Sequence, residues 1–316
     1  MARIDKGIDI TGGRTELSSF LIVLGFVFIG FFIGQFVGAI VSFAFAMLNG
    51  APIDALSEDA TIIYDYMGLG EVLTSQAFYT IVFTFITPYV YIRAIAHKKI
   101  EVLSTERGVE LPLVLATVVG TFCFIFLNSY FIEWNANIQF PEFMSGFEKW
   151  ARDLEDQLAE ATEKFTTFNN FSQFLFGFVV IAILPGIGEE LLFRGVLQNS
   201  LHRLTKNKHV AIWVTAFIFG AIHMQFYGLV PRMMLGAVFG YLYLWSGNIW
   251  YPIIAHIANN GFAVIAVYYA QLDEAAPNLD DTEAFPVTLQ IGGSLIFLAF
   301  MFFFRNHYLQ RKESIE

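Results

Sequence analysis

The sequence predicts an all-α, polytopic membrane protein, built as a bundle of about eight transmembrane helices. Apolar residues make up 56% of the 316-residue chain, charged residues only 15%, and the mean hydropathy is +0.58. A soluble globular domain carries about 25% charged residues. There are no repeats, and no linker is long enough to divide the chain. We therefore expect a single integral membrane domain over residues 1–316.

The apolar segments give the expected order of the spans. A helix needs roughly 20 mostly apolar residues to cross a hydrocarbon core of about 30 Å. The segments that meet or approach this length are residues 17–48, 72–96, 110–132, 171–194, 209–225, 229–246, 249–270 and 285–304. The fifth and sixth are short and poorly separated, so their boundaries are the least defined.

The loop charges orient the bundle. Segments 49–71 and 270–285 carry acidic residues and no Lys or Arg, and they account for much of the net charge of −10. Basic residues cluster elsewhere, at Arg3, Lys6, Arg14, Arg93, Lys98, Lys99, Arg107, Arg203, Lys206, Lys208, Arg305, Arg311 and Lys312. Because Lys and Arg are enriched on the cytoplasmic side, an even number of spans with both termini in the cytoplasm fits this pattern. No basic patch with interleaved aromatic residues suggests a nucleic-acid partner.

The first span carries three glycines on one helix face. Gly30, Gly34 and Gly38 are spaced four residues apart, which allows another helix to approach closely. We expect that helix to belong to the same chain, and a homodimer through this face is the alternative.

Residues 141–168 form the one clearly amphipathic segment. Its apolar residues recur every three or four positions, as in a helix with one apolar face, and charged residues lie between them. We expect an extracytoplasmic helix that packs over the bundle. Insertion into the membrane interface and pairing with another chain are the alternatives, although an acidic polar face is unusual for an interfacial helix.

Polar residues in the later spans form the candidate site. Glu189 and Glu190 are adjacent in an apolar stretch, where ionisable groups are costly and mark a function. Glu190 can pair with Arg194 across one helical turn, whereas Glu189 points about 100° away and is free to face a cavity. His223 lies in a later segment, and His256 shares a helix face with Asn260.

These groups suit hydrolysis without a protein nucleophile. A carboxylate and an imidazole can together deprotonate a water molecule, and a second imidazole with an amide can donate hydrogen bonds to the oxyanion that forms at a carbonyl. We prefer a mechanism without a cofactor. The alternative is a catalytic Zn²⁺ held by Glu189, His223 and His256, which is a sufficient ligand set.

Other protease chemistries lack their residues. The chain has no HExxH and no GxSxG motif, and Cys123, the single cysteine, has no group to activate it. GIGE at 186–189 differs from the GxGD of intramembrane aspartyl proteases by carrying Glu. Arg232 follows Pro231 near an expected membrane boundary, where we expect its side chain to snorkel.

Three motifs carry a resemblance to a known family. EELLFR at Glu189–Arg194, FGAIH at Phe219–His223 and HIANN at His256–Asn260 resemble the EExxxR, FxxxH and HxxxN motifs of the CAAX-protease and bacteriocin-processing (Abi) family of intramembrane proteases. Its best-known member is the type II CAAX prenyl endopeptidase. The similarity extends over roughly residues 171–270, the expected catalytic core helices, and does not include the helix at 141–168.

The resemblance implies an intramembrane glutamate-dependent endopeptidase, a family historically classed with the metalloproteases. By its pattern Glu189 is the base that activates water with His223, while His256 and Asn260 form the oxyanion hole. Glu190 and Arg194 then have supporting roles. The expected substrate is a membrane-associated or lipidated peptide or protein, and the expected location is the bacterial inner membrane, with the lipid bilayer as solvent.

Two functions from other classes remain open at this stage. Intramembrane Glu and His side chains also form proton relays, so a proton-coupled transporter could use the same groups. Transporters commonly contain two similar halves, however, and no internal repeat is visible. The second alternative is an immunity or scaffold protein that binds a peptide without cutting it.

Overall fold

The computed structural model describes residues 7–53, 60–105, 108–272 and 283–313, and every regular element in these ranges is helical. This confirms the all-α fold class. Six of the described helices are long and apolar enough to cross a membrane: Glu16–Leu48, Leu69–Ile95, Leu111–Ala136, Phe171–Thr205, Trp250–Leu272 and Val287–Gln310. The chain is therefore a multi-pass membrane protein.

Four of these spans are single helices: α1 (Glu16–Leu48), α5 (Leu111–Ala136), α12 (Trp250–Leu272) and α13 (Val287–Glu313). The second span is composed of α3 (Leu69–Thr80), η2 (Ile81–Ile86), α4 (Thr87–Val90) and η3 (Tyr91–Ile95). The fourth is composed of α7 (Phe171–Phe178), η6 (Val179–Ile183), α8 (Leu184–Glu190), η7 (Leu191–Gln198) and α9 (Asn199–Thr205). The η segments of these two spans are π-helical, a geometry that is frequent at functional sites.

The connections between the spans contain short 3₁₀ elements: η1 (Ala60–Tyr66), η4 (Ile100–Leu103) and η5 (Glu142–Met144).

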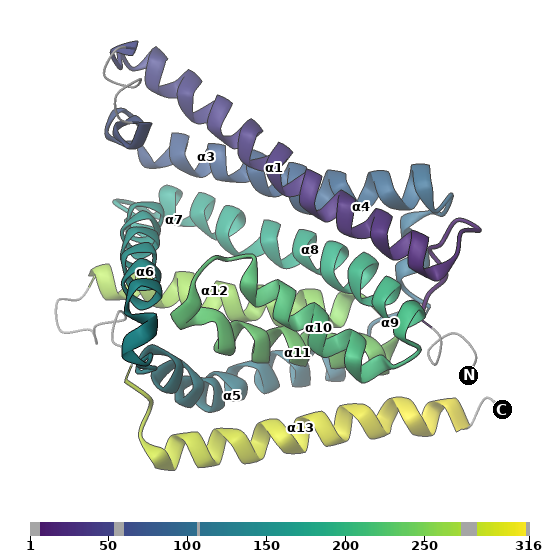
Figure 1. The fold of residues 1–316 in the computed structure, drawn as a ribbon. Helices are drawn as coiled ribbons and strands as arrows, with labels where there is room; N and C mark the ends of the chain where they lie inside the picture. The colour runs from purple at the N-terminus through teal and green to yellow at the C-terminus, as the bar shows by residue number, and fades with distance from the viewer. Residues whose placement is uncertain (1–6, 54–59, 106–107, 273–282, 314–316) are drawn as a thin grey trace.

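The fifth and sixth predicted spans, residues 209–225 and 229–246, require correction. The fifth is α10 (Lys208–Ala221), whose 14 residues reach only about 21 Å. The sixth is α11 (Leu229–Ser246), which lies outside the six apolar spans. The chain reverses between them because Met224 adopts a positive φ of 57° and a 3₁₀ turn, η8 (Phe226–Gly228), follows. Most of α11 is buried, and the hairpin lies in the middle of the bundle (Figure 1). The described residues thus contain six candidate spans and a helical hairpin, where eight spans were predicted.

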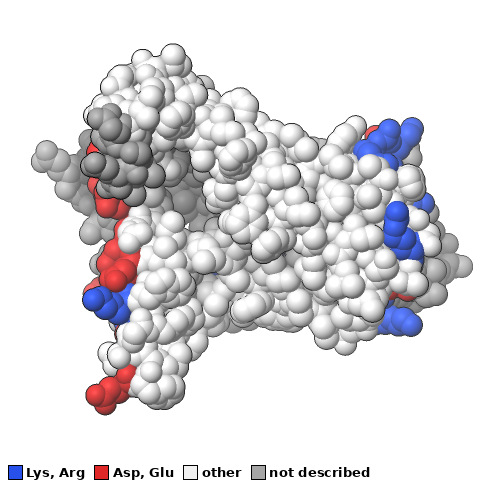
Figure 2. All heavy atoms as spheres, turned by 45° about the horizontal axis from the view of Figure 1, so that its top comes forward, with Lys and Arg blue, Asp and Glu red and all other residues white. Residues whose placement is uncertain are grey.

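The two ends of the bundle differ in charge. The beginning of α1 and the end of α13 lie at the same end (Figure 1). On the face that Figure 2 shows, Lys and Arg gather at that end, Asp and Glu at the opposite end, and an uncharged belt lies between them. This arrangement agrees with the predicted orientation. The loop charges at 1–6, 54–59, 106–107 and 273–282 lie outside the described residues.

The predicted amphipathic helix is α6 (Ser145–Thr166), and it lies across the end opposite to the chain termini (Figure 1). It packs on the turn between α10 and α11. The Phe147 ring meets Phe226 edge-on at 5.5 Å, and the Arg152 guanidinium lies 4.4 Å from the centre of the Tyr227 ring. This confirms the prediction that the helix packs over the bundle. Phe143 and Trp150 remain 86% and 52% exposed, so they face the surroundings of the protein.

The glycine face of α1 is used within the chain. Gly30, Gly34 and Gly38 are all buried against the second span, where they face Thr87, Phe83 and Tyr79. Any side chain on these glycines would meet α3, η2 or α4. The structure therefore supports intramolecular packing, and a homodimer through this face is not proposed.

We predict that Gly30→Leu destabilises the protein and that Gly25→Leu does not. A Cβ at Gly30 would overlap the Thr87 side chain, whereas a Cβ at Gly25 has no neighbour within 4 Å. Overpacking of this kind costs about 1–3 kcal/mol. Thermal unfolding of both variants in detergent micelles is the measurement, and equal midpoints for the two variants would contradict the packing described here.

Candidate active site

The two adjacent glutamates lie at the end of α8 in different environments. The Glu190 side chain is fully buried, and its Oε1 accepts a hydrogen bond of 2.6 Å from Arg194 Nη1. The Glu189 side chain remains 18% exposed. The predicted pairing of Glu190 with Arg194 is therefore confirmed, and Glu189 is the carboxylate that other molecules can reach.

Arg194 is a fully buried cation with several partners. Besides Glu190, it donates from Nη2 to the carbonyl oxygen of Gly236 at 2.8 Å. Its guanidinium carbon lies 4.9 Å from the ring centre of Phe219 and 5.3 Å from that of Phe239. Both distances are within the range of cation–π attraction. A buried charge needs such partners because desolvation alone costs several kcal/mol.

His256 joins the same cluster from α12. Its Nδ1 lies 2.8 Å from Glu190 Oε1, and its Nε2 lies 3.8 Å from Glu189 Oε2. An ionised carboxylate can only accept hydrogen bonds, so Nδ1 carries the proton. The ring stacks on Phe239 at 5.0 Å and meets Phe219 edge-on at 5.8 Å. Glu190 therefore fixes His256, and His256 turns its other nitrogen toward Glu189.

His223 lies in the turn after α10. Its Nδ1 is 2.8 Å from the carbonyl oxygen of Phe219, so Nδ1 is the donor and Nε2 keeps a free lone pair. Its ring also meets the Phe219 ring edge-on at 5.3 Å. Phe219 thus contacts both histidines and Arg194. No hydrogen bond joins His223 to Glu189 in the described part of the chain.

Asn260 lies one turn beyond His256 and binds the backbone of the fourth span. Its Nδ2 donates to the carbonyl oxygen of Ile181 at 3.3 Å, and its Oδ1 accepts from Asn259 at 3.2 Å. Pro185 has no N–H, so it cannot form the helical hydrogen bond to Ile181. In hydrocarbon such a carbonyl needs a partner, and Asn260 supplies it while one of its two N–H groups remains for another acceptor.

Two glycines allow the glutamates to approach the other helices. A Cβ on Gly186 would overlap Ile257, the neighbour of His256 on α12. A Cβ on Gly188 would overlap Thr84 and Phe85 in the second span. The sequence PGIGEE therefore places the glutamates between α12 and η2.

The described residues contain no group of three His, Cys, Asp or Glu side chains that could hold a metal ion. Glu189, His223 and His256 were the zinc ligands of the alternative to a mechanism without a cofactor. They form no such group of three in the described part of the chain.

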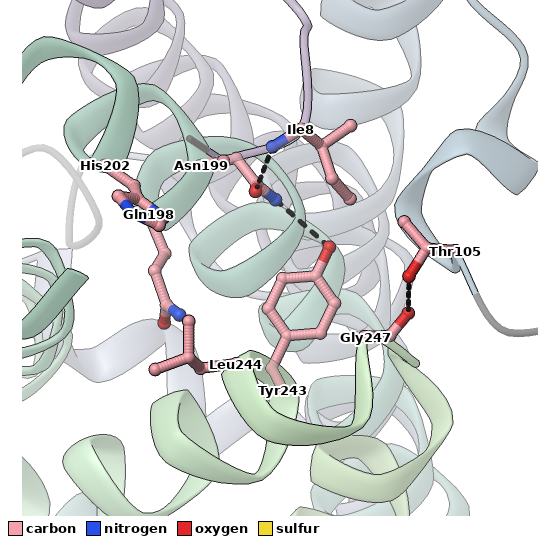
Figure 3. Close-up of a pocket in the computed structure, with 9 residues that line it drawn as sticks. Ile8, Thr105, Gln198, Asn199, His202, Tyr243, Leu244 and Gly247 are labelled. Atoms are coloured by element: carbon pink, nitrogen blue, oxygen red, sulfur yellow. Dashed lines mark hydrogen bonds between the residues drawn. The ribbon is translucent and has the colours of Figure 1, made fainter. Parts of the chain in front are cut away.

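A small cavity of about 30 Å³ lies elsewhere, near the end of the bundle where the chain begins. It is roughly large enough for one water molecule. Figure 3 shows Asn199 at its wall, accepting from the Ile8 amide at 2.9 Å and donating to the Tyr243 hydroxyl at 3.0 Å. None of the predicted site residues lines this cavity. Its hydrogen bonds join the N-terminal segment to α9 and α11.

Comparison with known proteins identifies the region that holds the motifs. Residues 171–262 match the family described as type II CAAX prenyl endopeptidase Rce1-like. This range includes Glu189, His223, His256 and Asn260. The match confirms the family resemblance of the three motifs.

Three curated bacterial proteins are similar to part of the chain. The identity is 29% over 98 residues with "Uncharacterized protein YpbD" and 33% over 115 residues with "Putative membrane peptidase YdiL", both of Bacillus subtilis (strain 168). It is 30% over 90 residues with "Membrane-embedded CAAX protease MroQ" of Staphylococcus aureus (strain USA300). The alignments cover 30%, 36% and 27% of this chain and 44%, 45% and 36% of the respective relatives. No solved structure matches the chain.

We predict that Arg194→Ala destabilises the protein far more than Glu189→Gln. Removing Arg194 leaves Glu190 as a buried carboxylate without its cation, which costs about 3–5 kcal/mol. Glu189 is partly exposed and forms no ion pair with an arginine among the described residues, so its neutralisation should change stability by about 1 kcal/mol or less. Thermal unfolding in detergent measures both. An Arg194→Ala variant as stable as the wild type would contradict the role assigned to this pair.

Proposed function

Because residues 171–262 match the family described as type II CAAX prenyl endopeptidase Rce1-like, we propose that this chain is an intramembrane endopeptidase. Its substrate is a membrane-associated or lipidated peptide or protein. The proposal rests mainly on the different environments of the two adjacent glutamates. Glu190 is fully buried and paired, whereas Glu189 beside it is partly exposed and faces His256 Nε2.

Glu189 is the base in this mechanism. It removes a proton from a water molecule, with His223 Nε2 as the second acceptor, and the water oxygen attacks the carbonyl carbon of the substrate. When the tetrahedral intermediate breaks down, the protonated Glu189 gives its proton to the leaving amine. This restores the carboxylate for another cycle.

His256 and Asn260 stabilise the oxyanion. His256 donates to Glu190 from Nδ1, so it can donate from Nε2 as well only in its imidazolium form. Asn260 contributes the N–H that the Ile181 carbonyl does not use. Removing one hydrogen-bond donor from an oxyanion hole typically lowers the rate constant of catalysis by about 10²–10³-fold.

This assignment keeps the total charge constant during the attack. The mechanism starts with ionised Glu189 and Glu190, which balance Arg194 and an imidazolium at His256. Once Glu189 has taken a proton, the cluster carries one positive charge and the oxyanion one negative charge. The total charge of the cluster and the substrate stays constant during the attack. No uncompensated charge therefore forms in a low-dielectric environment.

We predict that Glu189→Ala reduces peptide cleavage by about 10²-fold or more, because loss of a general base has an effect of this size. The measurement is the cleavage of a peptide library by purified wild-type protein and the variant, with products identified by mass spectrometry. Glu160→Ala, which changes a carboxylate on the exposed side of α6, is the control and should cleave normally. Undiminished cleavage by Glu189→Ala would eliminate this residue as the base.

We also predict that cleavage continues after removal of metal ions, since the predicted zinc ligands are not grouped together. Metal content and sensitivity to a zinc chelator should be measured on the same purified sample. Stoichiometric zinc that is lost together with activity would overturn metal-independent activation of water.

A further inference from the structure

Arg232 is a partly buried cation beside the turn that carries His223, and the mechanism does not use it. It lies in the first turn of α11, beside the turn that carries His223. Its Nη2 donates to Gln225 Oε1, and its Nη1 is buried without a hydrogen-bond partner in the described part of the structure. The expectation that this side chain snorkels toward water stays a prediction, because the residue as a whole is partly exposed.

The position of Arg232 is electrostatically unusual. The N-terminal turn of a helix favours anions, so a cation in the first turn of α11 adds to the positive end of the helix dipole. The guanidinium binds the side chain of Gln225, two residues after His223, and the described residues show no direct ion pair between it and a carboxylate. Gly228 leaves room for it, because a Cβ there would overlap the guanidinium.

Glu155 on α6 does not complete this site. One of its carboxylate oxygens accepts from Gln225 Nε2 at 3.1 Å, and the other accepts from the Tyr227 amide at 3.2 Å. Burial raises the pKa of the Glu155 carboxyl group, which weakens it as a full counter-ion. Glu155 instead binds the turn between α10 and α11 from the side of α6. Its hydrogen bond with Gln225 positions the side chain that binds the guanidinium of Arg232.

We propose that Arg232 binds a carboxylate group of the substrate next to the bond that Glu189 hydrolyses. A guanidinium presents its N–H groups in a planar fork that matches a carboxylate, and Nη1 is a donor without a hydrogen-bond partner beside the turn that carries His223. The carboxylate comes either from the C-terminus of the substrate or from an Asp or Glu side chain. Arg232 is therefore a residue that determines specificity.

This inference rests on the proposed function, but binding can test it without cleavage. Glu189→Gln serves as a non-cleaving background, and fluorescence anisotropy measures its affinity for labelled peptides in micelles. One pair of peptides differs in a free or amidated C-terminus, and a second pair carries Glu or Gln within the sequence. In one of the two pairs, we expect the carboxylate-bearing peptide to bind about 10- to 100-fold more tightly.

Variants of Arg232 decide which residue produces this preference. Arg232→Gln should abolish it, whereas Arg232→Lys should keep part of it because the positive charge remains. Arg152→Gln is the matched control, since Arg152 contacts the same turn through the Tyr227 ring but lies 46% exposed. This control should keep the full preference.

Several results would overturn the inference. The carboxylate and amide peptides of both pairs could bind equally, or not at all, or the preference could persist in Arg232→Gln. Cleavage by the wild type reports separately on the proposed function. A protein that prefers carboxylates through Arg232 but cuts none of the peptides would retain the binding site and lose the protease assignment.

Discussion

Glu190 Oε1 accepts hydrogen bonds from two directions, Arg194 Nη1 at 2.6 Å and His256 Nδ1 at 2.8 Å. The fourth span, α11 and α12 all meet at this carboxylate, because Arg194 also binds the carbonyl oxygen of Gly236 on α11. A carboxylate in hydrocarbon is stable only with such partners. The rest of the site is built around this requirement. Phe219 and Phe239 cover the guanidinium and the imidazole, and Gly186 and Gly188 let the helices approach.

The same interaction explains how Glu189 becomes available for chemistry. Glu190 uses its charge to hold Arg194 and to orient His256, and adjacent residues on a helix point in different directions. Glu189 therefore remains in a partly exposed position with His256 Nε2 beside it. Asn260 is held in place in a similar way, since the carbonyl that Pro185 leaves without a donor fixes one end of its amide. In our proposal, structural hydrogen bonds position each group that performs the reaction.

The sequence predicted the contacts that depend on local spacing. The pairing of Glu190 with Arg194 follows from the four-residue period of a helix, as does the common face of Gly30, Gly34 and Gly38. The sequence alone could not predict that His256 binds Glu190. The two residues are 66 positions apart, and only the packing of α8 against α12 brings them together. The contacts of Phe239 with Arg194 and His256 were missed for the same reason, and so was the hydrogen bond of Arg232 with Gln225. Hydropathy also gave eight spans because α10 and α11 are apolar, although neither is among the six helices that are long and apolar enough to cross a membrane.

The most direct test of this account compares Glu189→Gln with Glu190→Gln, measuring the rate of peptide cleavage per folded molecule and the thermal midpoint on the same preparations. The account predicts that Glu189→Gln melts close to the wild type and has lost cleavage. It predicts that Glu190→Gln melts at a clearly lower temperature, because Arg194 is left without its anion. If Glu189→Gln still cleaved, or if Glu190→Gln were as stable as the wild type, the division between a chemical and a structural glutamate would be wrong.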